Sequence, residues 1–330
     1  MSVIAVRDLR KTFRTRRKAA GMRASLRALV RPVYQQVEAV QGITFEMEAG
    51  EVLGFIGPNG AGKSTTIKML TGILHPSGGE ARVLGLVPWR ERRALAYRIG
   101  TVFGQRPQLW YHLPAVDTFR LFGKIYEMEE QVLTRRIAEL AEAFEIRDLL
   151  EIPVRKLSLG QRMRCEVAAS FLHKPQLLLL DEPSIGLDVV AKQRIRDAIR
   201  RMSQQEGVGV LLTSHDAGDL EALCKRVIII NHGQIVYRDS VSNLKRRYLT
   251  TKEVGVRFAE RVPPGFRMEG VEVLKVGRYG VKLRFDARRT PVEAVLSGLG
   301  AWGSLVDITI TDPPLETVIA RIYQEGAHRA

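Results

Sequence analysis

The sequence contains few of the features that secreted and membrane-spanning proteins need. Its 330 residues include two cysteines, Cys165 and Cys224, and both fall in apolar, helix-like surroundings rather than in a disulfide framework. No run approaches the roughly 18–20 apolar residues that cross a bilayer, and the first residues lack the apolar core of a signal peptide. We therefore expect a cytoplasmic protein with two reduced, buried thiols.

Acidic residues are nearly absent from the first part of the chain. The net charge is +15, and residues 1–37 contain ten lysines or arginines against a single acid, Asp8. Apolar residues recur at helical spacing between Met22 and Val33 beside a stripe of arginines, which predicts a basic amphipathic helix. Such a helix within residues 14–31 favours contact with anionic inner-leaflet lipid or an acidic membrane partner. The alternative is an insertion packed on its own domain with a solvated basic rim. Nucleic acid is not expected as a partner, because aromatic residues are not interleaved with the charges.

Residues 57–65 form the most informative motif of the chain. They fit the pattern G-x-x-x-x-G-K-[ST] and lie between the apolar run 52–56 and helix-forming residues. Glycines in such a loop let backbone N–H groups turn around phosphate oxygens at the positive end of a helix. Lys63 would reach the β- and γ-phosphates of a nucleotide, and the Ser64 hydroxyl would ligate Mg²⁺. The predicted ATP-binding residues of this loop are Gly57, Pro58, Asn59, Gly60, Ala61, Gly62, Lys63, Ser64 and Thr65.

A second motif places two acids at the end of a predicted strand. Residues 177–180 are four leucines, and Asp181 and Glu182 follow them. A continuous apolar run is typical of a strand buried on both faces of a parallel sheet, and ligands bind at the carboxyl ends of such strands. Asp181 is thus a candidate Mg²⁺ ligand, and Glu182 is a candidate to orient or deprotonate an attacking water. The alternative is an ordinary strand end with solvated acids.

With these motifs in place, the chain resembles the ATPase subunits of ATP-binding cassette (ABC) transporters over roughly residues 3–240. Phe13 matches the aromatic residue that stacks on adenine in that family, Gln105 matches its glutamine loop, and His215 matches its switch histidine. Residues 157–161 resemble the signature sequence of the family.

The resemblance extends to two further stretches. Residues 185–188 are similar to the loop that crosses the dimer interface in the family, and residues 313–319 resemble the tail of ATPases of the daunorubicin-like drug-exporter type. The ordered set of motifs, rather than any one of them, identifies the chain as a member of this family.

The resemblance implies roles for these residues. Gln105 would contact ATP and join Ser64 and Asp181 around Mg²⁺, while Glu182 and His215 would be the catalytic pair. A second subunit, most simply a second copy of this chain, would bind the same ATP in trans, so two chains close head to tail over two ATP molecules. The predicted in-trans residues are Ser158, Gly160, Gln161 and Asp188.

Two positions depart from the family pattern. Leu159 stands where the signature has its first glycine, which predicts altered packing at the dimer interface and bears on the hydrolysis rate. Gln105 lies one residue later than the commonest spacing, and Gln108 is a weaker substitute. Gly160 and Glu182 are retained, so we expect ATP binding in trans and hydrolysis.

Composition divides the chain into two parts. Residues 1–240 are expected to form the ATPase domain, an α/β P-loop NTPase cassette with a mixed-sheet core. This domain would carry the basic insertion at about 14–36 and a helical subdomain at about 106–172. Residues 241–330 alternate short strands and helices, which predicts a small α+β accessory domain that serves dimer contact or stability.

The sequence therefore predicts an ATP-hydrolysing subunit that energises a membrane transporter, most simply an exporter, by ATP-driven dimer closure. Separate membrane-spanning permease subunits would supply the path and hold the ATPase on the inner face of the cell membrane. The alternatives are an importer ATPase subunit and a soluble ABC ATPase acting on ribosomes or nucleic acid. Translation ATPases of the superfamily carry two cassettes and repair ATPases a long heptad insertion, and this chain has neither.

Overall fold

The computed structural model describes residues 2–16, 34–104, 107–214, 216–248, 251–263, 265–313 and 315–327. Gln105, His215 and the central part of the predicted basic insertion, with its amphipathic helix, lie outside these ranges. The chain divides into two compact units, Met1–Asp239 and Ser240–Arg329. Within the described ranges, none of the helices has the length and apolar character that a membrane span requires.

A three-stranded antiparallel sheet begins the first unit, with the strand order β2-β1-β4. Its strands are β1 (Ser2–Arg16), β2 (Tyr34–Glu48) and β4 (Gly78–Val83). Arg14 pairs with Gln36 and Arg16 with Tyr34. The two ends of the predicted insertion are therefore strand, because the backbone groups of the hairpin go on pairing beyond Phe13.

A six-stranded sheet forms the centre of the first unit, in the order β5-β6-β7-β3-β8-β9. The strands are β3 (Val52–Ile56), β5 (Ile99–Phe103), β6 (Leu177–Asp181), β7 (Gly209–Ser214), β8 (Arg226–Asn231) and β9 (Gln234–Ser240). All pairs from β5 to β8 are parallel. β9 returns as a hairpin through the two-residue turn His232-Gly233, in which both residues have positive φ. The predicted α/β fold with a mixed sheet is thus confirmed.

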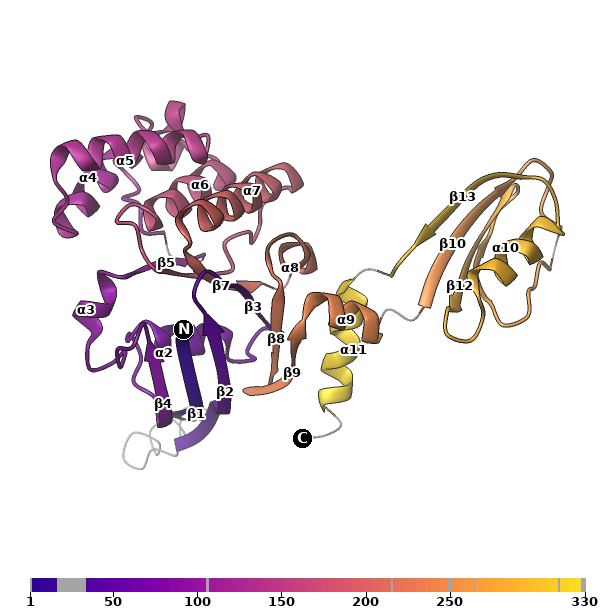
Figure 1. Cartoon of the computed structure of the whole chain (residues 1–330), viewed down its shortest axis with the longest axis horizontal. Helices are drawn as coiled ribbons and strands as arrows, with labels where there is room; N and C mark the ends of the chain where they lie inside the picture. Colours follow the sequence, from indigo (N-terminus) through magenta and orange to yellow (C-terminus); the bar gives the residue numbers. More distant parts are fainter. Residues whose placement is uncertain are drawn as a thin grey trace, which may run out of the picture. The chain divides into compact units, whose positions relative to one another are not determined.

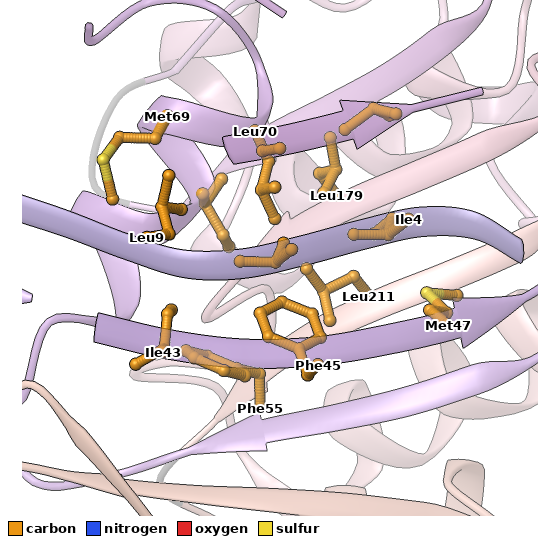
Figure 2. Close-up of a cluster of buried hydrophobic side chains, with 14 of the residues drawn as sticks. Ile4, Leu9, Ile43, Phe45, Met47, Phe55, Met69, Leu70, Leu179 and Leu211 are labelled. Carbon is orange, nitrogen blue, oxygen red and sulfur yellow. The ribbon is translucent and has the colours of Figure 1, made fainter. Parts of the chain in front are cut away.

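The main core lies between the two sheets (Figure 2). Ile4, Phe45 and Met47 from the antiparallel sheet pack with Phe55 and Leu211 from the central sheet, and all five are fully buried. Full burial of one such side chain stabilises the fold by about 1.5–3 kcal/mol. This core fixes β3, and β3 leads directly into the phosphate-binding motif.

Helices follow the parallel strands, as the α/β pattern requires. They are α2 (Lys63–Leu70), α3 (Arg92–Ala96), α4 (Ala115–Ile125), α5 (Glu130–Ala143), α6 (Leu159–Ser170), α7 (Val189–Glu206) and α8 (Ala217–Leu223), with 3-10 turns at Arg147–Leu149 and Val154–Lys156. Figure 1 shows α4 and α5 together, with α6 between them and the central sheet. Arg136 of α5 is buried and binds Glu206 at the end of α7 and the carbonyl oxygen of Phe171 after α6. This contact ties the helical subdomain to the helices beside the sheet.

The second unit is an α+β module. It contains α9 (Val241–Tyr248), β10 (Thr251–Phe258), β11 (Glu272–Val276), β12 (Gly280–Asp286), α10 (Val292–Gly300), β13 (Leu305–Thr311) and α11 (Leu315–Ala327). The four strands form an antiparallel sheet in the order β11-β12-β10-β13. α10 packs on one face of it through Val295 and Leu299. The alternation of short strands and helices that the sequence predicts for residues 241–330 is present.

Candidate nucleotide-binding site

The phosphate-binding motif forms the turn between β3 and α2. Gly60 and Gly62 have φ of 80° and 105°, which glycine adopts without strain. A Cβ on Gly62 would lie 2.5 Å from the carbonyl oxygen of Ala39, so no larger residue fits there. α2 begins at Lys63, and the unpaired N–H groups of its first turn give this end a partial positive charge.

A pocket of about 270 Å³ opens at this turn. The loop and α2 contribute residues 58–65 and Lys68, and the ends of β5 and β6 contribute Phe103, Gly104, Asp181 and Glu182. The structure therefore brings together the two motifs that the sequence singled out. Lys68, Phe103 and Gly104 were not predicted, although Gly104 directly precedes Gln105 in the chain.

The side chain of Lys63 lies between the loop and the acids. It is only 5% exposed, and its Nζ donates a hydrogen bond to the carbonyl oxygen of Gly57 at 2.6 Å. The same Nζ lies 3.4 Å from Oε1 of Glu182. The cation of the loop and the acid after β6 thus face the same space.

Thr213 of β7 holds the two acids in place. Its hydroxyl donates to Oδ1 of Asp181 at 2.6 Å and accepts from the backbone N–H of Glu182 at 3.1 Å. Glu182 has a φ of 54°, a conformation that costs a non-glycine residue about 1–3 kcal/mol unless its surroundings hold it. The buried Thr213 is such a constraint. Thr213 stands two residues before the predicted switch residue His215, but no motif of its own marks it in the sequence.

The chain after β5 lies directly against the acids. Gly104 donates its backbone N–H to the carbonyl oxygen of Asp181 at 2.9 Å, and a Cβ on Gly104 would lie 2.5 Å from the carbonyl oxygen of Glu182. Only glycine allows this approach. Gln105 follows immediately but lies outside the described residues.

Gln108, the weaker substitute for Gln105, already makes hydrogen bonds to other parts of the chain. Its side-chain amide donates to the carbonyl oxygen of Thr101, and its backbone N–H donates to the buried carboxylate of Glu166. Burial raises the pKa of Glu166, although hydrogen bonds from Gln108 and Leu109 act in the opposite direction. Glu166, which the sequence did not single out, therefore fixes the start of the helical subdomain.

The predicted in-trans residues lie outside the pocket, at the starts of α6 and α7. Ser158 caps α6: its hydroxyl accepts from the N–H of Gln161, and the Gln161 side chain accepts from the N–H of Ser158 at 2.8 Å. Asp188 caps α7 by accepting from the N–H of Ala191 at 2.8 Å. A Cβ on Gly160 would lie 2.8 Å from Cβ of Ala191, so the two helix starts are in close contact.

Leu159, the departure from the family signature, is the first residue of α6. Its side chain is 40% exposed, and its Cδ2 lies 3.2 Å from the position that a Cβ on Gly186 would take. The signature segment and the predicted interface loop are therefore neighbours within one chain.

Phe13 is not among the described residues that line the pocket. It lies half-buried in β1, where Nζ of Lys11 is 5.2 Å from the ring centroid. Its predicted stacking on adenine stays a prediction.

A buried cluster of charged and hydroxyl side chains lies behind the acids. Asp219 of α8 is 1% exposed and accepts from the hydroxyls of Ser184 and Ser214 and from Nε of Arg196 at 2.7 Å. Ser184 lies two residues after Glu182, and Ser214 directly precedes His215. Burial acts against ionisation of the adjacent Asp216, but hydrogen bonds, the first from Lys192, bring its pKa below the usual value. The cluster therefore links the start of the predicted interface loop, at Ser184, to the end of β7, at Ser214.

Known proteins resemble this chain in sequence, and solved structures resemble it in fold. The family model described as ABC transporter matches residues 40–185. NatA of Bacillus subtilis, an ABC transporter ATP-binding protein, is 32% identical over 63% of this chain and 84% of its own. The linearmycin resistance ATP-binding protein LnrL of Bacillus subtilis is 28% identical over 89% of this chain and 96% of its own.

Two further similarities agree with these. The daunorubicin/doxorubicin resistance ATP-binding protein DrrA of Streptomyces peucetius is 35% identical over 64% of this chain and 64% of its own. A solved dimeric ATP-binding cassette, bound to ADP and Pi in a post-hydrolysis state, shares the fold with a TM-score of 0.61 and 20% identity over 72% of this chain and 98% of its own. The chain therefore belongs to the ATP-binding proteins of ABC transporters, the ATPases that bind and hydrolyse ATP in those transporters.

Proposed function

We propose that this ATPase subunit works in an exporter, as a homodimer that closes over two ATP molecules and drives separate permease subunits. One arrangement carries the proposal: Lys63 and Ser64 at the start of α2 face Asp181 and Glu182 at the end of β6 across one pocket. A cation, a hydroxyl and two acids around a glycine-rich turn suit a nucleotide triphosphate and its metal ion.

The residues present fit Mg²⁺. This ion keeps several waters and needs one or two protein oxygens beside the phosphates, and the Ser64 hydroxyl and the Asp181 carboxylate border the pocket. The part of the chain that the structure describes has no group of three or more His, Cys, Asp or Glu residues that would form an all-protein cage. Ser64 and Asp181 would hold the ion, with Gln105 as a further ligand. When bound, Mg²⁺ would neutralise charge on the β- and γ-phosphates.

Glu182 would orient the attacking water or accept its proton. The Thr213 hydroxyl fixes the backbone of Glu182 and the carboxylate of Asp181 together, so both acids keep their positions without rearrangement. His215 would link the γ-phosphate to the same water. Lys63, released from the carbonyl oxygen of Gly57, would bind the phosphates.

A second copy of the chain would complete each site. In it, Ser158, Gly160 and Gln161 would present the start of α6 to the γ-phosphate, with Asp188 beside them. The start of α7, which lies against the start of α6, presents an exposed apolar surface: Val189 is 81% and Val190 63% exposed. Closure of the dimer would cover part of this surface, together with Leu159.

The permease contact would lie on the chain between Gln105 and α4. Trp110, Tyr111 and Leu113 are 52%, 52% and 37% exposed, which makes an apolar surface on the helical subdomain. Permease subunits docked there would hold the ATPase on the cytoplasmic face of the membrane, and the basic segment 14–31 would contact anionic lipid. Adenine stacking on Phe13 belongs to the same proposal.

Export is favoured over import by two relatives whose names state resistance, to linearmycin and to daunorubicin/doxorubicin, since removing a toxic compound from the cell confers resistance to it; one of them is matched over 96% of its length. The test is to purify the tagged full-length protein from gently solubilised membranes and to identify what accompanies it. We expect to recover proteins with several membrane-spanning segments, in stoichiometric amounts with this subunit. Recovery with a periplasmic or extracellular substrate-binding protein as well would favour an importer, and recovery only with ribosomes or nucleic acid would contradict a transport role.

A further inference from the structure

The four-stranded sheet of the second unit has one covered and one open face. α10 packs on the face that carries Val254, Val256 and Leu283, which are all buried. Because successive side chains alternate between the two faces of a strand, the intervening positions of β10 and β12 belong to the open face. They are Glu253, Gly255 and Arg257 on β10, and Gly280, Lys282 and Arg284 on β12.

One end of the open face is electrically balanced. Oε1 of Glu253 accepts a hydrogen bond from Nη2 of Arg284 at 2.7 Å, and Oε2 lies 2.7 Å from Nζ of Lys282. Nη1 of Arg284 in turn lies 3.6 Å from Oε2 of Glu272. Two acids and two bases thus satisfy one another at this end.

The adjacent row across the sheet is not balanced. Lys275 of β11 lies directly opposite Lys282 of β12, and like charges in such a pair destabilise a sheet. A bulge produces this pairing, because the register shifts between Val273 and Lys275 and leaves Leu274 without an opposing residue. In a regular strand Leu274 would oppose Lys282, and Lys275 would fall on the apolar face. Bulges re-aim side chains and are over-represented next to active sites and at the edges of sheets, where β11 lies.

The row that contains Lys275 and Lys282 continues across the sheet to a glycine, which leaves space above the backbone. Lys282 pairs with Gly255, and Gly255 pairs with Thr309 of β13. A Cβ added to Gly255 would meet no atom within 4 Å. A hollow of about 340 Å³ lies over these residues, within the range of about 300–1,000 Å³ typical of small-molecule sites. Glycine in mid-strand is often found where a ligand approaches the backbone.

The rim of the hollow has an excess of positive charge. Lys275, Lys282 and Arg257 contribute three positive charges and Asp307 one negative charge. Lys282 also forms an ion pair with Glu253. Lys275 and Arg257, by contrast, have no ion pair to any residue that the structure describes. A bound anion would face the positive charges of Lys275 and Arg257 and would add to the partial neutralisation of Lys282 by Glu253.

We propose that this hollow binds a small soluble molecule that carries a carboxylate or phosphate group. The anionic group lies between Lys275, Lys282 and Arg257, the body of the ligand rests over Gly255, and a hydroxyl or amine of the ligand faces Asp307. The hollow spans only a few residues in each direction, and Asp307 repels a continuous polyanion. Both features favour a small molecule over nucleic acid.

The test uses the full-length protein labelled with ¹⁵N-glycine. The amide signals of Gly255 and Gly280 report on the hollow, and those of Gly60 and Gly62 report on the nucleotide loop, so one spectrum separates the two sites. The probes are inorganic phosphate and citrate, added at constant ionic strength. Saturable shifts of Gly255 and Gly280 are expected with both probes, and they are independent of whether the loop binds ATP.

Variants decide whether the shifts arise at the basic rim. Lys275→Gln and Arg257→Gln should each weaken binding about tenfold, as expected for the loss of one hydrogen bond to a charged group. Arg267→Gln, an exposed residue of the same unit outside the hollow, should leave binding unchanged and serves as the control. Shifts that stay linear in probe concentration and equal in all variants would overturn the proposal. So would a response of these glycines to phosphatidylglycerol vesicles but to neither soluble probe.

Discussion

Nζ of Lys63 lies 3.4 Å from Oε1 of Glu182, although the two residues belong to motifs more than a hundred positions apart. The sheet produces this proximity, because β3 and β6 both pair with β7 and end at the same edge. The groups that would act on the γ-phosphate and on the attacking water are therefore positioned by the fold itself.

Glu182→Gln should lower the turnover of ATP by roughly 10²–10⁴-fold, the usual contribution of a general base, while ATP affinity is kept. The glutamine keeps the size of the side chain and removes its proton-accepting charge. Steady-state hydrolysis and equilibrium binding of labelled ATP measure the two effects separately. Glu142→Gln, on an exposed position of α5, is the matched control. Turnover near the unmodified rate would remove Glu182 from this role.

Thr213→Val should lower turnover about 10–100-fold, the range found when the residue that orients a metal-binding side chain is removed. Valine fills the same space, but its side chain neither donates to Asp181 nor accepts from the N–H of Glu182, which keeps only its bond to the backbone carbonyl oxygen of residue 213. Thr213→Ser restores the hydroxyl and should recover most of the activity. Equal activity of the Val and Ser variants would show that the hydroxyl is dispensable.

The fold could be predicted where the local sequence alone determines the structure. Four leucines before Asp181 indicated a strand buried on both faces, and the structure confirms it with β6, whose four leucines are all buried. The bulge at Leu274 was not predictable, because its register depends on the neighbouring strand β12 rather than on local sequence.

The site was predictable only in its conspicuous parts. Loop residues 58–65, Asp181 and Glu182 meet in the pocket as expected. Thr213 and Asp219 carry no motif of their own, and their roles come from contacts between β6, β7, α7 and α8. Such contacts join residues far apart in the chain and cannot be read from spacing.

Asp219→Asn should reduce the free energy of unfolding by about 3 kcal/mol, because it removes the buried charge that faces Arg196. Urea unfolding curves measure the change. Asp197→Asn removes a half-exposed acid that pairs with Arg200, and we expect less than about 1 kcal/mol for it. Similar losses in both variants would contradict a special role for the buried cluster.

Both thiols should be unreactive in the folded protein. Burial raises the pKa of Cys165 to about 12 and also raises that of Cys224, and the thiolate is the reactive form. Iodoacetamide at pH 8 should therefore leave both unmodified until guanidinium unfolds the chain. Above a pH of about 8.5 the unfolded thiols ionise and the folded ones do not, so their contribution to stability falls as pH rises. Stoichiometric labelling of either cysteine in folded protein, read by mass spectrometry, would contradict this burial.

The most direct test of the account is the molar mass of the Glu182→Gln variant, measured by light scattering with and without Mg-ATP. Each chain has a mass of 37.0 kDa, and the account predicts that Mg-ATP doubles the measured value when hydrolysis is blocked. Adding Lys63→Ala to the same variant should prevent the doubling, because it removes the phosphate contact of the loop. A monomer at saturating Mg-ATP, with binding verified in the same sample, would contradict ATP-driven closure of the dimer.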